Sequence, residues 1–249
     1  MQMTQKNKRI IAFAGRQRSG KTHLAKLLEK EKGAKIYTIA NYLKQLCCDL
    51  IGVNSISELN DLKNSKKELW IKPQCIEWGM KIENVTGISS NKIYSELKEY
   101  SVIKDVRELL QVIGTNIIRK YYPNWHIDQL IKDVMSSDDE LIAIDDVRFP
   151  NEYKAISEIG GEIFFIVRTA NVSKDMISNH QSETALMWFN FPNNKVILNV
   201  ADTHTMDNLF LSAYNNNFMN DDCRLLLSSQ FETLSNNPLV YEDLKCRIK

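Results

Sequence analysis

Short apolar runs alternate along this chain with segments in which apolar residues recur at helical spacing. The runs at residues 9–14, 34–38, 141–144, 162–168 and 195–200 predict strands, because they are short and rich in β-branched and aromatic side chains. Helical spacing predicts helices over residues 20–32, 42–51, 106–121, 125–135, 152–159 and 204–213. Strands that alternate with helices predict an α/β fold of three layers, a mostly parallel sheet with helices on both faces.

Residues 53–104 interrupt this alternation with a polar stretch that has no clear period. Because the stretch contains Trp70 and Trp78, we interpret it as a partly helical insertion rather than a disordered linker. A second polar stretch, residues 169–191, is predicted to be lid-like. We therefore expect a single domain over residues 1–217 and a C-terminal appendage over residues 218–249, to which the sequence assigns no role.

Composition places the chain among ordinary globular proteins, with 43% hydrophobic and 25% charged residues in a length of 249. The net charge of +1 supplies no general attraction to nucleic acid or to a membrane surface. The five cysteines form no C-x-x-C pair, which indicates reduced thiols. No apolar run approaches ~18 residues, and residues 1–9 lack an apolar signal core. We expect a soluble cytoplasmic protein that binds no membrane and no nucleic acid directly.

The segment at residues 15–22, with the sequence GRQRSGKT, lies between the first strand and the first helix. Its two glycines allow a tight turn whose N–H groups face inward and bind anions, and the helix dipole adds to this attraction. Lys21 can then reach the β- and γ-phosphates of ATP, while the Thr22 hydroxyl is the expected Mg²⁺ ligand. The alternative is an ordinary glycine turn. The expected nucleotide-binding residues are Gly15, Arg16, Gln17, Arg18, Ser19, Gly20, Lys21, Thr22 and His23.

Two further strands end in charged residues, and ligands of open α/β sheets gather at the carboxyl ends of strands. The strand at 141–144 is followed by Asp145, Asp146 and Arg148. The aspartates could hold Mg²⁺ through water, face an acceptor substrate beside Arg148, or cap the next helix. Arg168 ends the strand at 162–168, where it could stabilise a transferring phosphoryl group or form a surface ion pair.

The group His180, Ser182 and Glu183 has only a superficial likeness to a hydrolytic triad. No G-x-S-x-G turn surrounds Ser182, so the sequence favours a lid or turn network there.

Three blocks of the chain together resemble the deoxynucleoside monophosphate kinases of bacteriophages and related large DNA viruses. The first block is the loop at residues 15–22. The second contains Arg107, Gly114 and Thr115 and is followed by Trp125; the third runs from Asp145 to Glu152 and continues to Arg168. Fainter likenesses are Lys44 and the stretch 180–183, and the resemblance covers residues 9–200. It implies a P-loop kinase that uses ATP and Mg²⁺ to convert deoxynucleoside 5′-monophosphates into diphosphates for DNA precursor supply.

The resemblance also implies roles for individual residues. Those implied in catalysis are Lys21, Arg18, Arg148 and Arg168; those implied in acceptor binding are Lys44, Arg107, Gly114, Thr115, Trp125, Asp145, Asp146, Arg148 and Glu152. Trp125 could stack against a base or could be core, and Gly114 could admit a ligand or a packed neighbour. No general base is needed, because the second pKa of a phosphomonoester is about 6 and the attacking oxygen is already anionic.

Other functions stay open at this point. A P-loop kinase could act on another phosphorylated acceptor, such as dephospho-coenzyme A or phosphomevalonate. A non-catalytic ATP-binding module is a second alternative, whereas a GTPase switch is disfavoured because no N-K-x-D motif follows the strands. A homodimer is an open alternative to a monomer.

Overall fold

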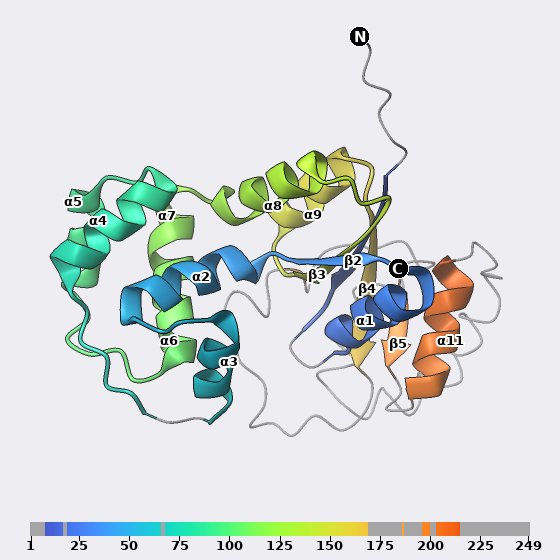
Figure 1. The fold of residues 1–249 in the computed structure, drawn as a ribbon, viewed down its shortest axis with the longest axis horizontal. Helices are drawn as coiled ribbons and strands as arrows, with labels where there is room; N and C mark the ends of the chain where they lie inside the picture. Colours follow the sequence, from blue (N-terminus) through green and yellow to red (C-terminus); the bar gives the residue numbers. More distant parts are fainter. Residues whose placement is uncertain are drawn as a thin grey trace, which may run out of the picture. The chain divides into compact units, whose positions relative to one another are not determined.

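In the described part of the chain, five parallel strands form one sheet, in the order β2-β3-β1-β4-β5. They are β1 (Arg9–Ala14), β2 (Lys35–Thr38), β3 (Leu141–Val147), β4 (Glu162–Arg168) and β5 (Val196–Asn199). The computed structural model (Figure 1) describes residues 8–16, 19–65, 68–168, 186, 196–199 and 203–214. The predicted α/β class with a parallel sheet is confirmed. The predicted lid, apart from Leu186, and the predicted appendage lie outside the described residues.

The chain divides into two compact units, which we call the sheet unit (residues 1–38 and 134–249) and the helical unit (residues 39–133). The helical unit contains more residues than the predicted insertion at 53–104, because it also includes α2 (Ala40–Ile51) and the helical run that begins at residue 106. Among the described residues, no helix combines the length and apolar character needed to cross a bilayer.

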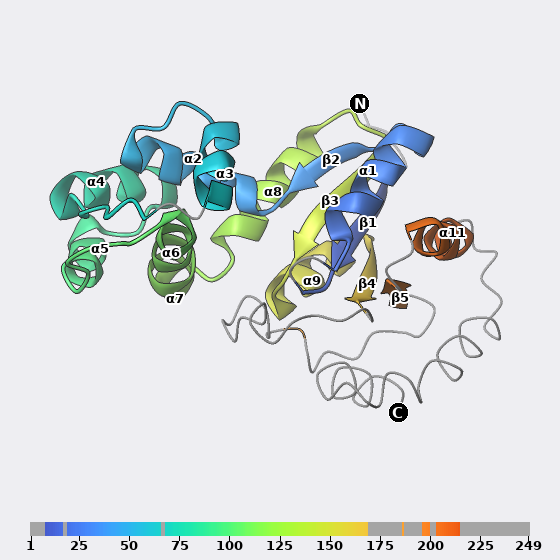
Figure 2. The same cartoon turned by 90° about the horizontal axis from the view of Figure 1, so that it is seen from below.

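Helices cover both faces of the sheet, as the alternation predicted (Figure 2). On one face, α1 (Lys21–Lys32) and α11 (Thr203–Tyr214) bury a core that includes Ile11 and Phe13. The ring of Phe210 meets that of Phe13 edge-on, with centroids 5.3 Å apart. Neighbouring strand residues point to opposite faces, so Ile10 faces α9 (Pro150–Glu158), whose Ile156 lies beside it at Gly161. This alternation explains why β1 is apolar from Ile10 to Ala14.

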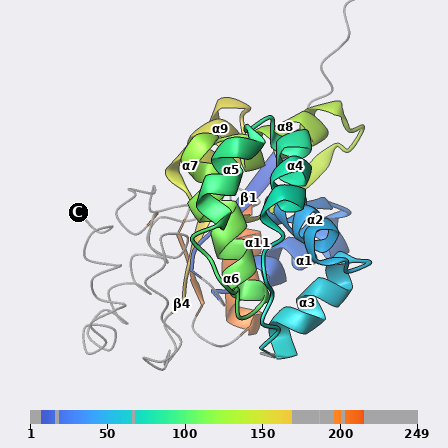
Figure 3. The same cartoon turned by 90° about the vertical axis from the view of Figure 1, so that its left-hand side faces the viewer.

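The helical unit consists of short helices around a separate apolar core. The predicted insertion contains α3 (Ile56–Ser65), α4 (Cys75–Thr86) and α5 (Ser90–Leu97), and is therefore partly helical as expected. Figure 3 shows α4 and α5 side by side. An antiparallel bridge between Ile71 and Ile103 joins the segment between α3 and α4 to the end of this insertion. The sequence lacked a clear period here because each helix buries only a few residues, among them Leu59, Trp78, Ile82, Ile93 and Leu97.

The predicted helix at 106–121 is one continuous run with a π-helical centre. It comprises α6 (Val106–Gln111), the π-helix η1 (Val112–Ile118) and α7 (Arg119–Tyr121), followed by α8 (Trp125–Ser136). The break that the sequence indicated at Gly114 and Thr115 is therefore a change of helical pitch. Such π segments are rare and often occur at functional sites.

Candidate active site

The loop between β1 and α1 has the backbone that the glycine spacing predicts. Gly15 and Gly20 have φ angles of +142° and +111°, which residues with a side chain rarely adopt. A Cβ on Gly15 would also lie 2.5 Å from the carbonyl oxygen of Ile166 in β4. The first glycine therefore permits both the turn and the close approach of the loop to the neighbouring strand. Gln17 and Arg18 lie outside the described residues.

Lys21 is the buried cation of this loop, with only 5% of its surface exposed. Its Nζ donates hydrogen bonds to the carbonyl oxygens of Gly15 (2.8 Å) and Arg16 (2.7 Å). The same Nζ lies 3.3 Å from Oδ1 of Asp146. The ammonium is thus fixed against the backbone of the loop, and phosphate binding by Lys21 stays a prediction.

Thr22 pairs with the first aspartate of β3. Its Oγ1 donates a hydrogen bond of 2.9 Å to Oδ2 of Asp145, which is buried. A hydroxyl and a carboxylate are oxygen ligands of the kind that Mg²⁺ prefers, and Mg²⁺ usually binds one or two carboxylates together with substrate phosphates. Among the described residues no group of three or more His, Cys, Asp or Glu side chains could hold a metal by itself. Thr22 and Asp145 therefore fit a metal that arrives with a nucleotide.

A bulge at the end of β3 allows the adjacent residues Asp145 and Asp146 both to contact the loop, at Thr22 and Lys21. Ala12 pairs with Ile144 and Ala14 pairs with Val147, so β3 carries one residue more than β1 over this interval. Asp146 has a φ of +73°, a left-handed conformation that is uncommon outside glycine. In a regular strand, adjacent side chains point to opposite faces, and bulges redirect them. The predicted strand at 141–144 thus continues to Val147, with the aspartates inside it rather than after it.

Arg148 is the second cation of the site and shares Asp146 with Lys21. Its Nε donates a 2.7 Å hydrogen bond to Oδ2 of Asp146. Glu152, almost fully buried, accepts hydrogen bonds from the backbone N–H groups of Arg148 (2.8 Å) and Phe149 (3.1 Å). Glu152 therefore caps α9 and fixes the turn that carries Arg148. A contact between Glu152 and a substrate stays a prediction.

The two cations determine the ionisation of Asp146. Burial raises the pKa of its carboxyl group. The Arg148 guanidinium and the Lys21 ammonium together lower that pKa by more than burial raises it, so it lies well below the usual range. The carboxylate therefore stays ionised across the physiological range of pH. Arg168 is the last residue of β4, and its side chain lies outside the described part of the chain.

The other residues expected to bind the acceptor belong to the helical unit. Lys44 is half-buried on α2, Arg107 is exposed in the first turn of α6, and Thr115 is half-buried in the π-helix. Trp125 is 2% exposed, and its Nε1 donates a 3.4 Å hydrogen bond to the carbonyl of Val85. Of the two roles left open by the sequence, this burial favours packing over stacking against a base.

Gly114 is buried directly against α2. A Cβ at this position would collide with Cδ2 of Leu43. The structure thus gives the glycine a packing role, and a contact between Gly114 and a ligand stays a prediction.

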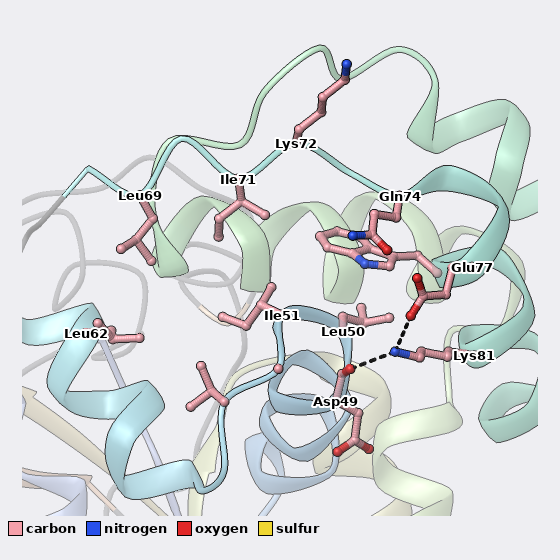
Figure 4. Close-up of a pocket in the computed structure, with 13 residues that line it drawn as sticks. Asp49, Leu50, Ile51, Leu62, Leu69, Ile71, Lys72, Gln74, Glu77 and Lys81 are labelled. Carbon is pink, nitrogen blue, oxygen red and sulfur yellow. Dashed lines mark hydrogen bonds and ion pairs between the residues drawn. The ribbon is translucent and has the colours of Figure 1, made fainter.

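Sequence reasoning missed a cavity of about 520 Å³ inside the helical unit (Figure 4). It is bounded by the end of α2, by residues 69–74 and by the start of α4. Lys81 closes one side, with its Nζ 2.6 Å from Oε1 of Glu77 and 3.0 Å from the carbonyl of Asp49. No periodic signal marks this cavity, because its walls come from segments without a common pattern. Its lining residues are Asp49, Leu50, Ile51, Gly52, Val53, Leu62, Leu69, Ile71, Lys72, Gln74, Glu77, Trp78 and Lys81.

Comparison with known proteins identifies the family. A family model described as deoxynucleotide monophosphate kinase matches residues 54–210. The chain belongs to this family. The matched part covers both aspartates and Arg148 and begins after the glycine loop, so the loop is evidence independent of the match. A relative from Acanthamoeba polyphaga mimivirus, provisionally named a deoxynucleotide monophosphate kinase, is 28% identical over 171 residues, which cover 62% of this chain and 78% of the relative.

Proposed function

We propose that this member of the kinase family transfers the γ-phosphoryl group of ATP to a deoxynucleoside 5′-monophosphate. The observation that carries the proposal is the pair of cations, Lys21 from the glycine loop and Arg148 from the turn after β3, which both contact the carboxylate of Asp146. Phosphoryl transfer requires cationic groups beside the donor phosphates and beside the acceptor phosphate at the same time, because both are anionic. Family membership supports the acceptor class.

In the proposed reaction, the loop amides and Lys21 bind the β- and γ-phosphates of ATP. Thr22 and Asp145 would hold Mg²⁺, which neutralises charge on those phosphates when bound. Arg148 binds the acceptor phosphate with a planar guanidinium that suits two oxygens at once.

An oxygen of the acceptor phosphate attacks the γ-phosphorus, and the bond from that phosphorus to the β-phosphate oxygen breaks. ADP leaves with the bonding electrons, and the acceptor becomes a diphosphate. The acceptor oxygen is already anionic near neutral pH, since the second pKa of a phosphomonoester is about 6. The protein therefore contributes positioning and charge rather than a general base. A role in acceptor binding for Lys44, Arg107 and Thr115 of the helical unit rests on the family resemblance alone.

The test is a coupled assay of ADP release with Mg-ATP and a panel of acceptors. The panel contains dAMP, dGMP, dCMP, dTMP, the corresponding ribonucleotides and dephospho-coenzyme A. We expect turnover with at least one deoxynucleotide and none with dephospho-coenzyme A. Turnover with dephospho-coenzyme A alone would assign the chain to another acceptor. ATP binding without turnover on any acceptor would make it a non-catalytic module.

A further inference from the structure

Asp146 is a single carboxylate shared by two cations at the carboxyl end of β3. Its Oδ1 lies 3.3 Å from Nζ of Lys21, and its Oδ2 accepts the 2.7 Å hydrogen bond from Nε of Arg148. The side chains of Lys21, Asp146 and Arg148 are 5%, 19% and 23% exposed. Charges that are shielded from water to this extent interact more strongly than pairs on the surface.

The backbone of Asp146 is held in an unfavourable conformation that maintains this contact. Its φ of +73° falls in the left-handed region, and the bulge in β3 places it there. Strained residues of this kind persist where the surrounding structure determines them, and they cluster at functional sites. Asparagine and glycine tolerate the same backbone, whereas β-branched residues do not.

Lys21 approaches from the loop side and Arg148 from the α9 side, and each already has a second anchor. Lys21 is bonded to the carbonyls of Gly15 and Arg16, and the backbone of Arg148 is fixed by Glu152. Asp146 is thus the common point between two separately anchored cations.

We propose that Asp146 is a positioning residue that fixes the spacing between Lys21 and Arg148 and, through its negative charge, lowers the affinity of the site for phosphates. This inference rests on the proposed function, because it assigns the two cations to the donor and the acceptor. The carboxylate repels the phosphates that both cations bind. It also orients those cations before the substrates arrive, which favours transfer over binding.

Two variants test this proposal, Asp146→Asn and Asp146→Gly, which both remove the charge and both adopt the native backbone. We expect either variant to bind Mg-ATP and inorganic tripolyphosphate about three- to tenfold more tightly, because a negative charge has left a partly shielded anion site. We expect kcat to fall by about 100-fold in Asp146→Gly, because the two cations lose their common anchor, and by less in Asp146→Asn, whose amide oxygen still accepts a hydrogen bond. Calorimetry measures the affinities, and the ADP-release assay measures kcat.

The matched control is Glu158→Gln, which makes the same change in net charge at an exposed position on α9 near Lys154. It should change neither quantity. Unchanged or weaker phosphate binding in a folded Asp146 variant would overturn the proposal, as would an unchanged kcat. If wild-type protein releases no ADP with any acceptor, the proposed function fails, but the two affinity measurements still decide whether Asp146 opposes phosphate binding.

Discussion

In the proposed mechanism, Lys21 supplies positive charge to the phosphates of ATP. Its ammonium is buried among loop carbonyls and a carboxylate, so its position is fixed before a phosphate binds. We expect Lys21→Ala to lower kcat for ADP release by about 10³-fold, the scale of losing a preorganised charge contact in a transition state. Leu24 and Leu28 still anchor α1 in the core, so circular dichroism should show a folded variant. Near-normal turnover in this variant would contradict the mechanism.

His126, which the sequence did not single out, is buried in the first turn of α8 beside the ring of Trp125, with centroids 4.9 Å apart. Burial, assisted by the nearby Arg119, lowers its pKa to about 3. Below a pH of about 6.5, His126 therefore binds a proton in the unfolded chain but not in the folded chain. The free energy of unfolding decreases as the pH falls from about 6.5 toward 3.

At pH 5 this linkage predicts a loss of about 2 kcal/mol in the free energy of unfolding relative to pH 7. Urea unfolding at both pH values should show the loss, and His126→Phe should remove most of it, because phenylalanine carries no proton. Equal losses in wild type and variant would show that His126 does not titrate as its burial requires.

At the scale of elements, one close contact accounts for the glycine in the π-helical centre of the run from α6 to α7. Gly114 faces Leu43 of α2 with no room for a Cβ. We expect Gly114→Ala to lower the free energy of unfolding by about 1–3 kcal/mol, the usual cost of overpacking. In a Leu43→Ala background the same substitution should cost less, since the colliding atom is gone. Equal costs in the two backgrounds would exclude this contact as the reason for the glycine.

The strands and helices of the sheet unit could be predicted from the sequence because each is encoded by neighbouring residues. The five strands were located within a few residues, and β3 differed most, since its bulge extends the pairing through the aspartates. The three helices between residues 56 and 97 had no readable period. Each is short, and its buried residues share a core with residues that lie far from it in the sequence, such as Leu46 and Val106.

For the whole molecule, nucleotide binding should appear as added stability. The binding groups of the loop belong to the folded sheet unit, so Mg-ATP should stabilise it, by about 2.7 kcal/mol at a concentration of 100 Kd. A thermal shift that falls when EDTA removes Mg²⁺, and that is lost in Lys21→Ala, would support a site built from Thr22, Asp145 and Lys21. A thermal shift of the same size with and without EDTA would contradict the proposed Mg²⁺ site.

The sequence by itself determined the parallel α/β architecture, the glycine loop and the family resemblance, because periodicity, glycine spacing and motif order are properties of residues that lie close together. It left open what each charged residue touches. Thr22 and Asp145 lie 123 positions apart, and only the pairing of β1 with β3 brings them together. The bulge then turns Asp146 toward Lys21 and Arg148, and packing alone buried Trp125. These features depend on strand register and on the filling of space, which are decided only when distant parts of the chain meet.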